Sequence, residues 1–400
     1  MKTHLGYAVI GLGVTEVGHL PGYSALLLET EAARLAIEDA GLKASDIGAA
    51  VQMLSDAGSG IRPRHHDSFA RALNLPVNVY MENVGRGGEY VAHAFVVAMQ
   101  LLKLGIAQYV VCAGARDDWS RSRAAKVEFG RRGQVYAPKK NAVAQLFGAG
   151  PPTYHALLAA RHMHEYGTTS EQFGAVAVAQ RQWANSNPRA VMAGRTLTLE
   201  EHQRSPLIVG PYRLYDLCLQ SDGGTAFVMT TADRARDASR PPIFVAGVGF
   251  GEQMSHLWWE KRNYTTLAVH SARDAAFRQA GVHIKEIDVA QLYDCFTGEV
   301  IIQLEDYGWC AKGEGGAFAA EMRTAPGGSI AVNTGGGLLS SHHLGNLTGF
   351  AEAVHQLREE AGERQVRDAR IALVSGHGGE ILSGQMCSIH STVVLKRDEQ

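Results

Sequence analysis

The chain lacks any pair of cysteines close enough in sequence to suggest a disulfide framework or a zinc site. Its five cysteines are scattered, their number is odd, and no Cys-x-x-Cys motif occurs. Isolated thiols of this kind are typical of proteins in a reducing compartment. We therefore expect free thiols, no bound metal and a cytoplasmic location. The cysteines are Cys112, Cys218, Cys295, Cys310 and Cys387.

An excess of one charge and a long apolar run are also missing. The 38 Lys and Arg residues nearly balance the 40 Asp and Glu residues, which leaves a net charge of −2. This balance offers no electrostatic attraction for nucleic acid or an anionic membrane. No run of about 18 apolar residues occurs, and Met1–His4 leads directly into a strand pattern. We expect neither a membrane span nor a signal peptide.

What the 400 residues do contain is an alternation of short buried strand patterns with helix patterns, and 46% of the residues are hydrophobic. That order predicts an α/β protein with enough apolar material for two core-forming units. In the first half, strands are expected at 7–12, 49–54, 77–81, 109–115 and 225–230, and helices at 24–40, 89–104, 153–166 and 170–185. In the second half, strands are expected at 243–249, 287–292, 330–332, 369–374 and 386–395, and helices at 267–280, 297–307 and 348–361.

Several glycine clusters predict turns between these elements. Gly11–Gly18 has the spacing GxGxxxxG, and no helix pattern follows it at once, so we interpret it as a turn and not as a dinucleotide site. Residues 83–88, 333–337 and 376–379 are further glycine turns. Arg116–Pro152 is rich in Arg and Lys without clean periodicity, and it predicts an inserted loop region. Residues 234–242 form the best linker candidate.

The two halves repeat each other. Positions 32, 36, 40 and 41 carry the same residues, Ala, Ala, Ala and Gly, as positions 272, 276, 280 and 281. Further along, Asn83-x-Gly85-x-Gly87 matches Asn333-x-Gly335-x-Gly337, and each triplet lies between a strand and a helix pattern. Because only two copies occur, this is duplication of one unit and not a solenoid.

The segment Leu292–Glu299 places a phenol, a carboxylate and a thiol on one strand-to-helix turn. In α/β proteins the carboxyl ends of strands are where ligands bind. Tyr293 is therefore a candidate catalytic residue, although a packed aromatic at a strand end is the alternative. We expect Asp294 to cap the following helix and Cys295 to be a small buried residue.

With these motifs together, the chain resembles the thiolase superfamily, in particular its sterol-carrier-protein-thiolase-like or lipid-transfer-protein branch. The resemblance implies two five-stranded mixed sheets in α-β-α-β-α layers, with halves at 1–235 and 243–400 and a loop domain inserted at about 116–168. It also implies acyl-CoA binding and a homodimer. The motifs that carry it are Gly11-Leu12-Gly13-Val14-Thr15, Ala40-Gly41-Leu42, Ser221-Asp222-Gly223-Gly224, Asp294-Cys295-Phe296-Thr297, Leu304–Gly308, Lys312–Gly316, Asn333–Gly337, Gln356-Leu357-Arg358 and Arg364-Gln365-Val366.

The departures from that family are informative. The position of the family's nucleophilic cysteine falls at Val84, and the second cysteine falls at about Ser375. Tyr293 replaces the usual Asn or His, and His343 keeps the family histidine in a looser motif. Without a nucleophile at Val84 no acyl-enzyme forms there. The same pattern resembles the retro-aldolases that shorten the steroid side chain, which commonly carry a second Tyr where this chain has His343.

These likenesses imply carbon–carbon cleavage of a bulky, steroid-like β-hydroxyacyl-CoA into a ketone or aldehyde and a shorter acyl-CoA, with the CoA thioester as substrate and no other cofactor. Such a cleavage needs a base for the hydroxyl proton and a stabilised enolate. We predict Tyr293, with a lowered pKa, as the base and His343 at the enolate, with His377 as a third candidate. His342 competes with His343. We expect Val84, Gly378 and Gly379 to line the substrate site, with peptide N–H groups of the two glycines holding the thioester oxygen.

Two alternatives remain open: a thiolase-type acyltransferase that uses Cys295 or another thiol, and a non-catalytic subunit that binds acyl-CoA or a lipid. The basic region between Arg116 and Lys140 either meets the CoA phosphates or is a solvated loop. The resemblance further implies a small partner of the DUF35 type, with a zinc ribbon and an OB fold.

Overall fold

The computed structural model describes residues 4–53, 68–82, 84–85, 88–122, 151–255, 263–382 and 385–397. The strands in the sheets are β1 (Tyr7–Val14), β2 (Ala49–Gln52), β3 (Val79–Met81), β4 (Val110–Asp117), β5 (Leu207–Val209), β6 (Tyr212–Arg213), β7 (Asp222–Thr231), β8 (Ile243–Ser255), β9 (Val289–Gln291), β10 (Ala331–Val332), β11 (Ile371–Leu382) and β12 (Gln385–Arg397). The helices are α1 (Ala25–Asp39), α2 (Phe69–Ala72), α3 (Tyr90–Lys103), α6 (Pro151–Tyr166), α7 (Ser170–Asn185), α8 (Leu199–Arg204), α9 (Ala232–Ala235), α10 (Val269–Ala280), α11 (Thr297–Tyr307), α12 (Gly315–Ala320) and α13 (Asn346–Leu357).

The large sheet consists of two similar half-sheets joined edge to edge. In the described ranges its order is β10-β9-β11-β12-β8-β1-β7-β4-β2-β3. Only the pairs Ala8–Phe244 and Val9–Ile243 join β1 to β8. Outward from this junction, β1, β7, β4, β2 and β3 repeat as β8, β12, β11, β9 and β10, with the same parallel and antiparallel pairings. The predicted duplication is confirmed in the topology, and each half has the expected five strands.

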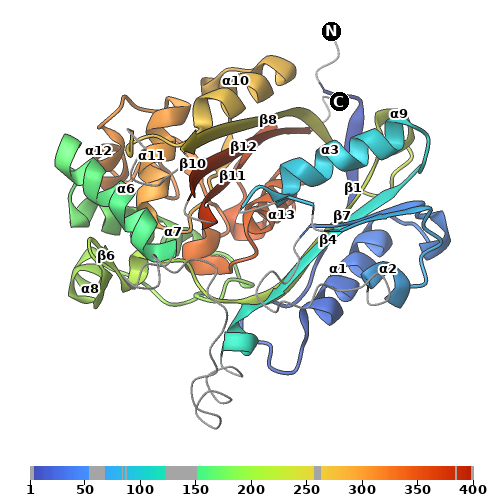
Figure 1. Cartoon of the computed structure of the whole chain (residues 1–400), viewed down its shortest axis with the longest axis horizontal. Helices are drawn as coiled ribbons and strands as arrows, with labels where there is room; N and C mark the ends of the chain where they lie inside the picture. Colours follow the sequence, from blue (N-terminus) through green and yellow to red (C-terminus); the bar gives the residue numbers. More distant parts are fainter. Residues whose placement is uncertain are drawn as a thin grey trace.

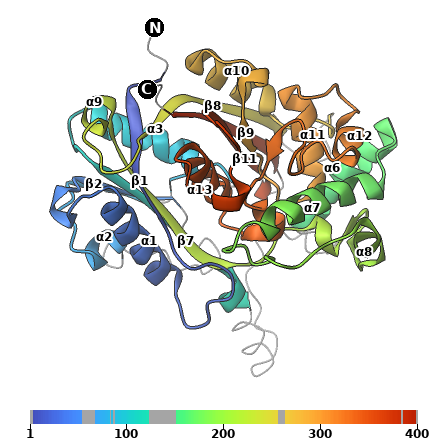
Figure 2. The same ribbon diagram turned by 180° about the vertical axis from the view of Figure 1, so that it is seen from behind.

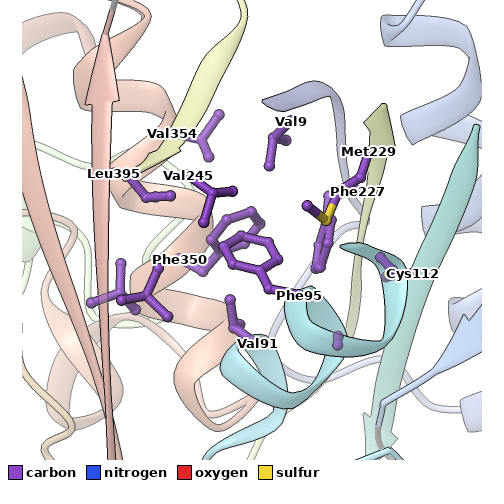
Figure 3. Packing of buried hydrophobic residues seen from close by; sticks show 14 of the residues in the cluster. Val9, Val91, Phe95, Cys112, Phe227, Met229, Val245, Phe350, Val354 and Leu395 are labelled. Atoms are coloured by element: carbon purple, nitrogen blue, oxygen red, sulfur yellow. The ribbon is translucent and has the colours of Figure 1, made fainter. Parts of the chain in front are cut away.

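Helices α3 and α13 lie in a layer between the two half-sheets (Figure 1). Phe95 of α3 and Phe350 of α13 meet edge to face with ring centroids 5.7 Å apart, and Phe227 of β7 lies 5.3 Å and 4.8 Å from them. Figure 3 shows these side chains inside the buried cluster that both half-sheets share. Helix α1 covers the outer face of one half-sheet and α10 that of the other (Figure 2). The predicted α-β-α-β-α layering is confirmed.

Gly11 and Gly13 lie inside β1, so the turn that we predicted there is wrong. A Cβ atom at Gly11 would lie 2.2 Å from the carbonyl oxygen of Ala36 in α1. The same close approach recurs in the second half, where a Cβ at Gly249 would lie 1.9 Å from the carbonyl oxygen of Ala272 in α10. These glycines let each outer helix pack directly on the backbone of its strand.

Most helix ends follow the predicted signals. The Ser24 side chain accepts a hydrogen bond from the Leu27 N–H at the start of α1. Gly281, with φ of 63°, ends α10, and α11 spans the predicted residues. Differences occur in the second half: α13 begins at Asn346 and not at 348, α12 is not among the predicted helices, and Gly337–Ser341 forms a π-helical turn.

Gly376–Gly379 is extended and belongs to β11, so the predicted turn is wrong. This segment pairs with residues 388–391 of β12 in an antiparallel ladder that continues to Leu382 and Gln385. The long ladder supplies hydrogen-bond partners that keep a glycine-rich segment straight. Because β9 pairs with β11 only up to Val374, no strand of the described ranges pairs with the other edge of β11 at Gly376–Gly379, and we call this its free edge.

The helices that follow the basic region pack on the second half, although they belong to the first half in sequence. In both views α6 and α7 lie beside α11 and α12 (Figures 1 and 2). Residues 62–66, 83, 86–87 and 123–150, which include most of the basic region, are outside the described residues. Among the helices of the described ranges, none has both the length and the apolar character needed to cross a membrane.

One buried carboxyl group gives a stability prediction. Glu29 of α1 is 3% exposed, accepts a hydrogen bond of 3.0 Å from Gln52 Nε2, and its Oε1 has no hydrogen-bond partner among the described residues. Burial raises its pKa to about 8. The folded state therefore keeps a proton that the unfolded chain loses above its ordinary pKa of 4.5, so stability falls as pH rises through this window.

We expect Glu29→Gln to remove this loss. Between roughly pH 5 and pH 8, the free energy of unfolding of the wild type should fall by about 1.4 kcal/mol per pH unit relative to the variant. Urea unfolding at several pH values measures this difference. Glu31→Gln, at a surface ion pair with Arg34 on the same helix, is the control and should leave the slope unchanged. Equal slopes for wild type and Glu29→Gln would contradict the prediction.

Candidate active site

The turn between β9 and α11 holds Tyr293 by its backbone. The Tyr293 N–H donates to Ser375 Oγ at 2.8 Å, and its carbonyl oxygen accepts from Gln303 Nε2 at 2.7 Å. Ser375 Oγ in turn donates to Gln303 Oε1 at 2.6 Å. This closed set of buried hydrogen bonds joins β11, α11 and the turn, and it fixes where the phenol points.

The structure brings the three predicted catalytic side chains together. The ring of Tyr293 lies 6.5 Å from that of His343 and 6.4 Å from that of His377, centroid to centroid, and both pairs are close to perpendicular. His342 instead lines a small pocket on the other side of its loop, where Ser341 Oγ contacts its Nδ1 at 3.0 Å. Of the two neighbouring histidines, His343 faces Tyr293.

Gly88, just before α3, closes this group from the first half of the chain. A Cβ atom at Gly88 would lie 2.4 Å from the His377 carbonyl oxygen and 2.4 Å from a ring carbon of Tyr293. Only a glycine leaves room for the phenol here. The His377 carbonyl therefore points away from β12. Since backbone groups alternate along a strand, the N–H of Gly379 points to the same free edge and that of Gly378 points to β12.

Burial changes the predicted acid–base roles. It raises the pKa of Tyr293 well above its ordinary value of 10, and the nearby Arg116 opposes this only in part. The predicted lowering of this pKa is wrong. Burial, assisted by Arg116, lowers the pKa of His343 to about 3. At neutral pH the site thus contains a protonated phenol, a donor, beside an uncharged imidazole whose acceptor nitrogen is Nδ1, which accepts a hydrogen bond from the Gly345 N–H at 3.3 Å.

Asp294 does not cap α11, contrary to our expectation. Its carboxylate accepts hydrogen bonds from the N–H groups of Leu338 (2.9 Å) and Leu339 (3.3 Å) in the π-helical turn. The residue at the start of α11 is Phe296, and no side chain caps it. Burial raises the pKa of Asp294 to about 7, against the effect of these N–H donors. Asp294 therefore fixes the loop that leads to His343.

Neither Val84 nor Cys295 offers a reactive nucleophile. Val84 is 8% exposed, belongs to the central hydrophobic cluster, and its N–H donates to the Gln52 carbonyl oxygen at 2.9 Å. Cys295 is buried, and burial raises the pKa of its thiol well above 9. Nucleophilic catalysis needs the thiolate, which this environment disfavours. The geometry speaks against the acyltransferase that uses Cys295.

The sequence did not single out two parts of this site. The sequence predicts Arg116 within the basic loop, but in the structure it belongs to β4 and forms an ion pair of 2.9 Å with Asp118. It lies close enough to lower the pKa values of both Tyr293 and His343. Its buried Nε has no hydrogen-bond partner among the described residues. No sequence motif predicts the hydrogen bond between Ser375 and Gln303. The sequence indicates only that Ser375 lies at about the position of the family's second cysteine.

The duplicated sheet and a site at the ends of the inner helices define a thiolase-fold protein without the nucleophilic cysteine. Residues 251–397 match the family model described as "Thiolase C-terminal domain-like". The chain is 35% identical over 384 residues to a steroid side-chain-cleaving aldolase of Thermomonospora curvata, which covers 94% of this chain and 96% of that one. It is 32% identical over 357 residues to the 17-hydroxy-3-oxo-4-pregnene-20-carboxyl-CoA lyase of Mycobacterium tuberculosis, with 88% and 91% covered.

An acetyl-CoA acetyltransferase of Methanothermobacter thermautotrophicus is 32% identical over 392 residues, with 96% of this chain and 98% of that one covered. The solved structure described as "Ltp2-ChsH2(DUF35) aldolase" superposes with a TM-score of 0.84 and 33% identity, over 99% of this chain and 98% of that one. The chain belongs to the thiolase superfamily, in its sterol-carrier-protein-thiolase-like branch.

The hydrogen bonds around Tyr293 give a prediction. Ser375→Ala leaves the buried Tyr293 N–H and Gln303 Oε1 without their partner, so we expect the free energy of unfolding to fall by about 1–3 kcal/mol. Urea unfolding measures the change. Ser239→Ala, which removes an exposed hydroxyl bonded to the Asp39 carbonyl, is the control and should change it little. Equal stability of wild type and Ser375→Ala would show that this network does not hold the turn.

Proposed function

We propose that this chain cleaves a carbon–carbon bond in a bulky, steroid-like β-hydroxyacyl-CoA by a retro-aldol reaction. The products are a ketone or aldehyde and a shorter acyl-CoA. The observation that carries the proposal is the convergence of Tyr293, His343 and His377 in a thiolase frame whose nucleophile position is a buried valine. The similar aldolase and lyase, which are named for steroid side chains and a CoA thioester, support it.

We assign the two main roles in reverse of the sequence prediction, and the directions of the two pKa shifts support this assignment. The uncharged imidazole of His343 takes the proton of the β-hydroxyl group as the bond between the α and β carbons breaks. The electron pair of that bond passes to the thioester as an enolate, and the protonated Tyr293 hydroxyl donates a hydrogen bond to the enolate oxygen. The His343 imidazolium then returns its proton to the α carbon. The Gly379 N–H, on the free edge of β11, is a second donor for the thioester oxygen.

Tyr293→Phe tests the donor role. It keeps the ring packing but removes the hydroxyl, so we expect kcat to fall by about 10²–10³ with little change in KM, because the charge develops only after the bond begins to break. The measurement is release of the shorter acyl-CoA from a steroid-like β-hydroxyacyl-CoA. Tyr109→Phe, outside this group of side chains, is the control. Unchanged cleavage by Tyr293→Phe would contradict the proposal, as would a covalent acyl-enzyme after acetyl-CoA treatment.

Variants of the two neighbouring histidines, His342 and His343, test which of them acts as the base. We expect His343→Gln to lower kcat by about 10²–10⁴, because glutamine cannot take the hydroxyl proton. His342→Gln should leave kcat near the wild-type value, since His342 lies on the other side of the loop. The same assay of acyl-CoA release, run with both variants, measures this difference in kcat. Equal losses in both variants would show a structural effect of the loop and would remove His343 from the mechanism.

The same proposal includes an assembly. We infer a homodimer with a DUF35-type partner in the cytoplasm, supported by the similarity to the solved Ltp2-ChsH2(DUF35) aldolase structure and by the family resemblance. The activity assay is therefore run with the chain alone and with such a partner. Ligand binding without turnover under both conditions would favour the non-catalytic subunit instead.

A further inference from the structure

Three metal-ligating side chains meet next to His377, and the proposed reaction uses none of them. His155 comes from α6, Cys295 from the turn before α11, and Glu299 from the first turn of α11. An imidazole nitrogen, the thiol sulfur and a carboxylate oxygen all lie within 4.8 Å of one another. His155 and Cys295 are each 7% exposed and Glu299 is fully buried.

The hydrogen bonding of this cluster is incomplete. His155 Nδ1 contacts Glu299 Oε1 at 2.5 Å, and the His155 ring stacks on Phe296 with centroids 4.6 Å apart. The second carboxylate oxygen, Glu299 Oε2, is buried without a hydrogen-bond partner among the described residues. A buried carboxylate oxygen without a partner is costly, so the cluster favours a bound cation.

We propose that His155, Cys295 and Glu299 bind one zinc(II) ion. A set of one nitrogen, one sulfur and one oxygen donor suits zinc, whereas magnesium and calcium prefer oxygen donors alone. A thiolate and a carboxylate together balance the charge of the divalent ion, which makes a buried site neutral. On binding, Cys295 releases its thiol proton to solvent. The ion takes the place of the hydrogen bond between His155 Nδ1 and Glu299 Oε1, and the proton of that bond moves to His155 Nε2, so that the imidazole binds as its neutral tautomer.

The geometry needs only small adjustments. Zinc bonds to these donors are about 2.0–2.3 Å long, so side-chain shifts on the order of 1 Å bring all three donors around one ion. Three protein ligands leave a fourth position for water or another ligand. The His155 ring lies 6.1 Å from that of His377, so the ion lies beside the candidate active site. Binding does not depend on the proposed cleavage, and it is measured without substrate.

Cobalt(II) is the probe, because a cobalt–thiolate bond has a near-ultraviolet charge-transfer band and tetrahedral cobalt absorbs in the visible. The full chain is treated with a chelator, desalted and titrated with cobalt chloride. We expect one equivalent to bind with both bands and zinc to displace it. Cys295→Ser should lose the charge-transfer band, and His155→Asn should weaken binding at least about 100-fold, since loss of even an outer partner costs 10–100-fold.

Cys310→Ser is the matched control, because Cys310 is a free, partly exposed thiol outside the cluster, and this variant should keep both bands. Circular dichroism confirms that each variant is folded. If Cys295→Ser does not fold, His155→Asn and Glu299→Gln carry the test. The absence of a stoichiometric charge-transfer band in the wild type, or its persistence in Cys295→Ser, overturns the proposal. Either outcome leaves the retro-aldol assay unaffected, so the two proposals fail separately.

Discussion

The packing of Phe95, Phe227 and Phe350 between the half-sheets is the constraint on which the site depends. These rings fix α3 against α13, one helix from each half. The two helix starts are then joined directly, because the Val91 N–H donates to Asn346 Oδ1 at 3.3 Å. Gly88 precedes one helix and the loop with His343 precedes the other. The first half therefore closes the group of Tyr293, His343 and His377, which come from the second half, and adds Arg116 to it.

Burial determines the protonation states of the polar groups at this site. A phenol and an imidazole exposed to water would titrate near their ordinary pKa values. Neither would then be fixed in one protonation state or one orientation. In the interior, the charged forms of both are disfavoured, so Tyr293 keeps its proton and His343 lacks one. Arg116 contributes positive charge to both groups, which moves each pKa in the same downward direction. The result is a phenol that keeps its proton close to an imidazole with one unprotonated nitrogen, which suits movement of one proton between a hydroxyl group and a carbon.

The sequence predicted the repeat, the layers and the position of the site because these depend on patterns that are local or duplicated. The alternation of strands and helices and the matching residues of the two halves require no knowledge of distant contacts. The errors arose where tertiary contacts decide. Gly11 and Gly376 look like turn residues, but one accommodates a helix and the other continues a ladder with β12. The pKa of Tyr293 depends on burial by side chains that no motif identifies.

The duplicated topology also allows the turn after β2 to be compared with the equivalent turn after β9. The first is apolar, whereas the second carries polar side chains. The pairs Ala50–Val111 in the first half and Ala290–Leu373 in the second occupy the same place in the repeated topology. Three residues further along are Met53 and Tyr293. Met53 is fully buried, and its N–H donates to the backbone carbonyl of Ala113, so the ladder between the two strands simply continues.

In the second half, the residue at the place of Ala113 is Ser375, and its side chain, not a backbone carbonyl, receives the Tyr293 N–H. Strand β9 accordingly stops at Gln291, while β2 pairs up to Gln52. A serine hydroxyl lies farther from its own strand than a carbonyl does, so the chain leaves the ladder early and turns the phenol toward His343. The exchange of a backbone partner for a side-chain partner is thus the local change that distinguishes the turn with the candidate catalytic Tyr293 from its core-forming counterpart.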